Sequence, residues 1–155
     1  MKKRFTAVLF AALAMVTIVP QASADDSNAH LTSIVTSKHN GFERVELVMD
    51  RLPSQSLADE VDEVWDCAKD VRIPVGGQNF LRTTHFDAAA SDGGKPTYTG
   101  PRNFVPQGLT NVKGIAISCN FESTLGVSVG FDNPASTYQV YPQTNPTRVV
   151  IDIHG

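Results

Sequence analysis

The sequence predicts an all-β fold, a small antiparallel β-sandwich of about seven to eight strands. Apolar and polar residues alternate with a period of two in several short runs, most clearly at 42–50 and 148–153. That alternation is typical of strands with one buried face. Gly, Pro, Asn and Asp separate the runs at short intervals. About 131 residues follow an expected leader, enough for one domain with a single core.

The amino terminus is typical of a signal peptide over residues 1–24. A basic patch, an apolar run at 7–19 and small residues at 22–24 occur in that order. As a helix the apolar run would span about 20 Å, less than the roughly 30 Å of a hydrocarbon core, so a signal peptide is favoured over an uncleaved anchor. We expect cleavage before Asp25, a flexible segment at 25–30 and no membrane span in the mature chain.

The charge balance of the mature chain is acidic. Without the three basic residues of the leader, ten Lys and Arg face sixteen Asp and Glu, a net charge of about −6. An acidic surface argues against nucleic acid as a partner. The expected signal peptide predicts a secreted or envelope-associated protein, and the charge balance indicates that nucleic acid is not its partner.

Cys67 and Cys119 are the two cysteines. In an exported chain an even pair predicts a disulfide, which would stabilise the fold by about 4 kcal/mol in the chain-entropy model. A metal site is the alternative, but the spacing of metal-binding motifs is missing. We expect neither a metal nor a cofactor. Surface or turn positions are expected for the four histidines: His30, His39, His85 and His154.

The strands are assigned in chain order. β-branched residues predict the first strand at 31–36. In 42–50 the apolar residues Val45, Leu47 and Met49 alternate with charged ones, and Pro53 ends that run. The segment 56–70 is ambiguous because its apolar residues recur at helical spacing. The all-β context favours extended structure there, which is our prediction.

The second half of the chain continues the pattern. In 79–86 one side chain set is Phe80, Arg82 and Thr84, and the intervening residues form the other. Strand-like runs then follow at 112–121, 125–131, 138–141 and 148–153. Between them 88–106 is rich in Gly and Pro and is expected to be irregular. Loops of this length in a small domain are often functional.

The segment Gly126-Val127-Ser128-Val129-Gly130 matches the GxSxG pattern of serine hydrolases, and Asp132 and His154 follow in the matching order. A nucleophile elbow requires a strand, a sharp turn and a helix. Here the alternation runs straight through the motif, which favours a continuous strand with one small-residue face. A catalytic site is therefore not expected.

The loop 88–106 carries the candidate ligand-binding residues Tyr98, Arg102 and Lys95. An arginine offers a planar fork of donors for a carboxylate, and a neighbouring tyrosine offers a flat apolar surface and one hydroxyl. The alternative is that the arginine binds loop carbonyls and only holds the loop in shape.

Three runs of the chain resemble the AMIN-like domain of secreted and lipid-anchored actinobacterial proteins: 39–45 (HNGFERV), 88–101 (AAASDGGKPTYTGP) and 146–153 (PTRVVIDI). The likeness covers most of residues 31–155. It implies a β-sandwich related to the amidase N-terminal domain, a non-catalytic module thought to target proteins to the cell envelope or peptidoglycan. It also implies strand structure for 56–70 and fits a bridge between the two cysteines.

Two features depart from the family pattern. No cysteine for lipid attachment stands at the cleavage point, and Ser91 occupies a position where some relatives have histidine. The second departure puts a histidine-dependent function of the loop in doubt.

The sequence therefore predicts an exported, non-catalytic binding module that contacts cell-wall glycan or peptide, or an envelope protein. Two alternatives remain open, a small hydrolase built on Ser128 and a scaffold that binds another protein through an exposed strand edge.

Overall fold

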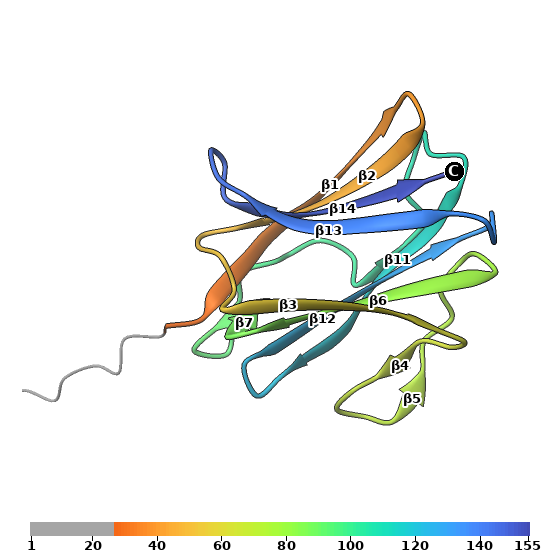
Figure 1. Ribbon diagram of the computed structural model, residues 1–155. Helices are drawn as coiled ribbons and strands as arrows, with labels where there is room; N and C mark the ends of the chain where they lie inside the picture. Colours follow the sequence, from red (N-terminus) through yellow and green to blue (C-terminus); the bar gives the residue numbers. More distant parts are fainter. Residues whose placement is uncertain (1–26) are drawn as a thin grey trace, which may run out of the picture.

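The structure, a computed structural model, describes residues 27–155 as two facing five-stranded sheets (Figure 1). The first sheet has the strand order β13-β14-β2-β1-β7 and the second has β10-β11-β12-β6-β3. The fold class expected from the sequence is confirmed. Eight strands of seven residues or more form the sandwich: β1 (Ala29–His39), β2 (Phe42–Met49), β3 (Gln55–Val61), β6 (Asn79–Phe86), β11 (Val112–Phe121), β12 (Thr124–Phe131), β13 (Thr137–Gln143) and β14 (Arg148–His154).

The remaining six strands have two residues each. Two pairs form separate small hairpins, β4 with β5 and β8 with β9. Their bounds are β4 (Trp65–Asp66), β5 (Val71–Arg72), β7 (Ala88–Ala89), β8 (Ser91–Asp92), β9 (Lys95–Pro96) and β10 (Asn103–Phe104). In the part of the chain that the structure describes, no helix is long and apolar enough to cross a membrane.

The core lies between the two sheets because each strand turns one set of alternating side chains inward. In β2 every second residue is buried. The period of two seen in the sequence therefore corresponds to alternating buried and more exposed positions. The same holds for β6, whose buried side chains are the set beginning with Leu81. The largest core residues come from both layers: Leu31, Leu47, Ile151 and Ile153 from the first sheet, and Leu81, Ile115, Leu125 and Val127 from the second.

The first strand begins earlier than expected. β1 starts at Ala29, inside the segment 25–30 that we predicted to be flexible. Ala29 pairs in parallel with Ala88, and Nδ1 of buried His30 lies 2.7 Å from Oδ2 of Asp50. These contacts anchor Ala29 and His30, and neither contact could be predicted from the local sequence. The expected signal peptide at 1–24 lies outside the described residues.

The ambiguous segment 56–70 contains no helix and is extended at 56–61 and 65–66, as the all-β context and the family resemblance indicated, whereas 67–70 forms a turn. β3 pairs along its whole length with β6 at the edge of the second sheet. The chain then enters the short hairpin of β4 and β5. The helical spacing of its apolar residues therefore reflects no helix.

The segment 62–78 covers the outer face of the second sheet. The predicted disulfide is confirmed, and it joins Cys67 in this segment to Cys119 on β11. We call the segment 62–78 the cover, and its residue Val64 is buried. Gly76 lies so close to Gly114 and Gly130 that a β-carbon on any of the three would collide with backbone atoms of its neighbour. Glycine is required here because two backbones meet.

The segment 88–106 is less irregular than expected, since all of β7, β8, β9 and β10 fall within it. β7 joins the edge of the first sheet and β10 joins the edge of the second. The β8–β9 hairpin turns at Gly93 and Gly94, both of which have positive φ. The segment therefore runs from one sheet to the other.

Candidate functional site

Two clefts of the sandwich are candidate binding sites. The loop cleft has a volume of about 390 Å³ and is lined by residues of the 88–106 segment with two residues of β11. The end cleft has a volume of about 450 Å³ and lies where the β1–β2 turn meets the loops around Thr110 and Asp132. Lining residues of the loop cleft are Ala90, Ser91, Pro96, Tyr98, Thr99, Gly100, Arg102, Ile117 and Asn120.

Hydrogen bonds to the rest of the sandwich hold the walls of the loop cleft. The side chain of Asn120 accepts a bond of 2.8 Å from the backbone N–H of Ala90. The hydroxyl of Thr97 donates to the carbonyl of Leu31 over 2.8 Å, and the backbone N–H groups of Thr97 and Tyr98 both donate to the carbonyl of Ala90. The cleft is therefore attached to both sheets.

Tyr98 organises the loop from inside. Its ring packs against the core, and its hydroxyl donates to the carbonyl of Pro101 over 3.0 Å. Burial raises the pKa of this phenol, so the hydroxyl keeps its proton at neutral pH. Gly100 allows the ring to sit there, because a β-carbon at this position would collide with the tyrosine hydroxyl.

Arg102 is held by its backbone but not by its side chain. Its carbonyl accepts a bond of 2.8 Å from the N–H of Ile117, which fixes the residue against β11. Within residues 27–155 the guanidinium makes neither a hydrogen bond nor an ion pair. The sequence left open the alternative that Arg102 binds loop carbonyls. In the structure Tyr98 binds such a carbonyl, that of Pro101, and so holds the loop in shape.

The three predicted binding residues are not equivalent. Tyr98 and Arg102 line the same cleft. Lys95 is exposed on β9 and faces Asp92 across the small hairpin, and it is not among the residues that line the loop cleft. Ser91, where some relatives have histidine, also lines the cleft, 3.5 Å from the amide nitrogen of Asn120.

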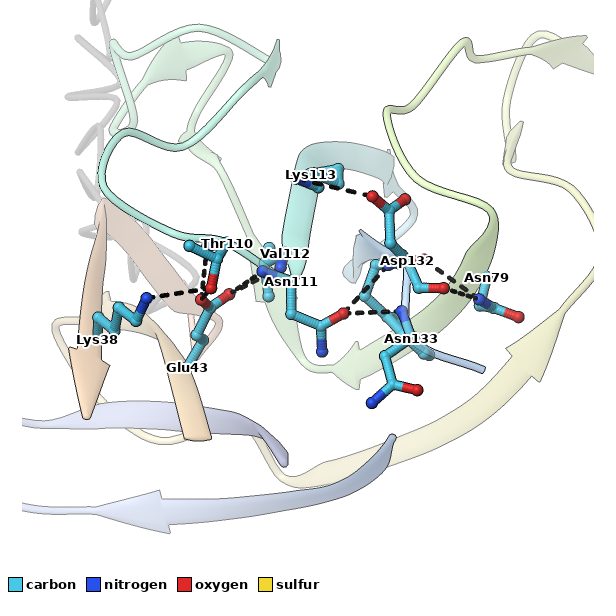
Figure 2. Close-up of polar contacts among 10 residues, drawn as sticks. Lys38, Glu43, Asn79, Thr110, Asn111, Val112, Lys113, Asp132 and Asn133 are labelled. Carbon is cyan, nitrogen blue, oxygen red and sulfur yellow. Dashed lines mark hydrogen bonds and ion pairs between the residues drawn. The ribbon is translucent and has the colours of Figure 1, made fainter. Parts of the chain in front are cut away.

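The end cleft is built around a buried carboxylate (Figure 2). Glu43 on β2 accepts four hydrogen bonds, from the backbone N–H groups of Thr110, Asn111 and Val112 and from the hydroxyl of Thr110, at 2.6 to 3.0 Å. Burial alone would raise the pKa of this carboxyl. The hydrogen bonds outweigh burial and lower the pKa, so the group is charged at neutral pH.

Asn111 continues the wall of the end cleft toward the loop after β12. Its side-chain oxygen accepts bonds from the backbone N–H groups of Asp132 and Asn133, and its nitrogen donates to Ser136 over 2.8 Å. The carboxylate of Asp132 lies 3.6 Å from Lys113 (Figure 2). Lys38 closes the other side, where its ammonium donates to the hydroxyl of Thr110 over 3.1 Å.

Rings border the end cleft. His39 stacks on Phe42 with a centroid separation of 4.5 Å and an angle of 5° between the planes. On the outer face of the first sheet Arg44 lies 5.1 Å from the Phe42 ring and binds Asp152 through two nitrogens. Local sequence gave no signal for this cleft, because its residues come from segments far apart in the chain.

The residues of the GxSxG pattern do not form a catalytic constellation. Ser128 is fully buried in the middle of β12, and its hydroxyl lies 2.9 Å from that of Ser118. His154 belongs to the other sheet and packs against Phe42. The pattern is the small-residue face that lies under the covering segment 62–78.

Two histidines, His30 and His85, are buried and do not occupy the surface or turn positions expected from the sequence. Burial is most complete for His85. It is fully buried, and burial lowers its pKa to about 4. Its Nδ1 lies 2.8 Å from the hydroxyl of Ser56, and its Nε2 lies 3.0 Å from that of Thr83. Thr83 donates its own proton to the carbonyl of Val127, so Nε2 of His85 is the donor in their contact. Nδ1 therefore accepts from Ser56.

A family model for the AMIN-like domain matches residues 29–155. Searches of curated proteins and of solved structures gave no match. The match extends from the start of β1 to the last residue of the chain and includes both clefts. The chain therefore belongs to the AMIN-like domain family.

Proposed function

We propose that this protein is an exported, non-catalytic binding module of the cell envelope, and that its loop cleft holds a carboxylate of cell-wall glycan or peptide. Family membership supports the envelope-associated role. The disulfide supports an oxidising compartment outside the cytoplasm. Neither observation selects the ligand, which has to be argued from the cleft.

The free guanidinium of Arg102 carries the proposal. It lines the loop cleft without a partner among the described residues, while its backbone is fixed to β11. Among residues 27–155, those that line this cleft include no acidic side chain. A guanidinium in that setting offers two parallel donors to a carboxylate, the geometry in which charge-assisted hydrogen bonds are strongest.

The rest of the cleft complements such a ligand. Tyr98 supplies an apolar wall but has already committed its proton to Pro101, so its contribution to binding is contact area. Ser91 of the loop and Asn120 of β11 supply polar groups to the same cleft. Lys95 is exposed on the neighbouring hairpin and would add long-range attraction without direct contact.

Sedimentation with purified, protein-free cell wall tests the proposal. The exported protein should sediment with the wall, and Arg102→Ala should weaken binding about tenfold or more, the size expected for a lost charge-assisted pair. Arg51→Ala is the matched control, since Arg51 is exposed and lines neither cleft. Equal sedimentation of both variants would remove Arg102 from the site.

A second measurement separates the competing classes of function. A protein-binding scaffold should fail to sediment with bare wall and should instead be retained by envelope protein. A hydrolase should turn over ester or amide probes, and Ser128→Ala should abolish that activity. Either result contradicts the proposed wall-binding module.

A further inference from the structure

The end cleft is a second place where this protein could hold a ligand, independent of the loop cleft. Apart from Glu43 and Ile153, which are buried, the residues around it are exposed or half-buried: Lys38, His39, Gly41, Phe42, Thr110, Asn111, Asp132, Asn133 and Gly155. None of them lines the loop cleft. The hydrogen-bonding capacity left over in this cleft indicates what it could bind.

The acceptors of the end cleft are largely occupied by the protein itself. Both oxygens of Glu43 are bound by two donors each. The side-chain oxygen of Asn111 accepts two backbone N–H groups, and that of Asn133 accepts the N–H of Ala135 over 3.0 Å. The carboxylate of Asp132 faces Lys113.

The donors are not occupied to the same extent. Because Ala135 identifies the oxygen of the Asn133 amide, the nitrogen is the other atom, and no group in 27–155 accepts from it. The nitrogen of Asn111 uses one of its two protons on Ser136. The ammonium of Lys38 uses one of its three on Thr110.

The two amide nitrogens also converge. A β-carbon placed on Gly155 would lie 3.1 Å from the nitrogen of Asn111 and 3.5 Å from that of Asn133. The two nitrogens therefore flank the same bare α-carbon. A compact acceptor that entered beside Gly155 could reach both.

The charges and the apolar surface around the end cleft further restrict the class of ligand that it could bind. The positive charge of Lys38 is joined to the negative charge of Glu43 through the Thr110 hydroxyl. Asp132 is matched by Lys113. Side-chain charges around the cleft therefore balance, which favours an uncharged ligand over an ion. The stacked rings of His39 and Phe42 offer contact to an apolar portion of that ligand.

We infer that the end cleft binds an uncharged amide or acetamido carbonyl, held by the side-chain nitrogens of Asn111 and Asn133. The inference does not rest on the proposed function, because the loop cleft and Arg102 take no part in it. Peptide amides and N-acetylated sugars both carry this group, and different probes can separate them.

The test is an NMR titration of the ¹⁵N-labelled exported protein. N-acetylglycinamide should shift the amide signals of Gly41, Asn111 and Asn133 in a saturable way, and the anion N-acetylglycine should bind more weakly. N-acetylglucosamine compared with glucose shows whether a sugar-borne acetamido group is accepted as well. If the anion binds more tightly, or if signals around the end cleft do not move, the inference is wrong.

Asn133→Asp is the decisive variant. It keeps the oxygen that accepts from Ala135 and removes the donor, so affinity for N-acetylglycinamide should fall at least about fivefold. Gln107→Glu, an amide-to-acid exchange at an exposed residue that lines neither cleft, is the matched control and should retain affinity. If Asn133→Asp fails to fold by its own spectrum, Gly155→Ala is the second variant: its β-carbon would lie beside both amide nitrogens and should weaken binding of N-acetylglycinamide by about fivefold, and unchanged affinity would contradict the inference. Unchanged affinity in folded Asn133→Asp contradicts the inference.

Discussion

The two sheets of the sandwich deal with their outer faces in opposite ways. The second sheet is covered by segment 62–78, so that Gly126, Ser128 and Gly130 on the far side from the core are buried as well. The outer face of the first sheet carries a network of Arg44, Asp152 and Tyr141, and no segment within the described residues 27–155 covers it in this way (Figure 1). One sheet therefore relies on close backbone packing, and the other on satisfied charges.

Removing the disulfide should have the largest effect, since it holds the cover on the second sheet. Replacement of both Cys67 and Cys119 by alanine should lower the free energy of unfolding by about 4 kcal/mol, an upper figure from loop closure. Urea denaturation measures the loss. Limited proteolysis should then cut first within 62–78. A first cut in the first sheet would show that the cover does not depend on the bridge.

Breaking the charge network tests the first sheet. Arg44→Leu leaves the carboxylate of Asp152, which is 3 % exposed, with only Tyr141 as a partner. We expect a loss of about 3 kcal/mol in the free energy of unfolding. The matched control is Arg82→Leu on the second sheet, whose pair with Asp59 is half-exposed and should contribute less than about 1 kcal/mol. Equal losses would contradict the contrast between the faces.

Acid should weaken the second sheet first, through His85. Its pKa is about 4 in the folded protein and about 6.5 when exposed, so the unfolded chain takes up the proton first as pH falls. The contribution of neutral His85 to the free energy of unfolding is fully present above pH 6.5. It is lost progressively as the pH falls to about 4, by about 2 to 3 kcal/mol. Thermal unfolding between these pH values measures it, and His85→Gln should flatten the curve.

Glu43 and Asp152 respond at lower pH. Hydrogen bonds lower the pKa of both carboxyls against the effect of burial, so their contribution is present above their ordinary range and lost as pH falls below it. Both lie in the first sheet. If the wild-type protein and His85→Gln lose stability over one and the same pH range, the predicted separation between His85 and the two carboxyl groups is contradicted.

The smallest effect is expected at the backbone contact beneath the cover. Gly130→Ala would drive a β-carbon into the carbonyl of Gly76, and we expect a loss of about 2 kcal/mol as the backbones separate. Ser128→Ala, on the same face, removes only the bond to Ser118 and should cost about 1 kcal/mol. Denaturant midpoints compare the two. A larger loss in Ser128→Ala would contradict close packing as the reason for glycine.

Local pattern was sufficient for most of the fold because inward and outward positions alternate in strands such as β2 and β14. It was also sufficient to interpret Gly126 to Gly130 as a strand with a small-residue face. The sequence did not reveal why that face is small, since the reason is Gly76, some fifty positions away. Small residues on one face of two consecutive strands, β11 and β12, were the available signal for a second covered side.

The candidate sites divide in the same way. Tyr98 and Arg102 could be proposed from sequence because they lie in one loop. The end cleft could not, because Glu43, Thr110 and Asn133 meet only through the pairing of distant strands. His85 was misjudged for a related reason: its burial is tolerated through Ser56 and Thr83, and the first of these lies on another strand.

Glu43 belongs to one layer of the sandwich, and all four of its donors belong to the segment that leads into the other. One carboxylate thus ties the two layers together at the floor of the end cleft, and the floor is already ordered before anything arrives. A ligand that binds there would cause little loss of conformational entropy in the protein. Differences in affinity between ligands of the end cleft should therefore reflect the contacts that each ligand makes, and not a rearrangement of the protein.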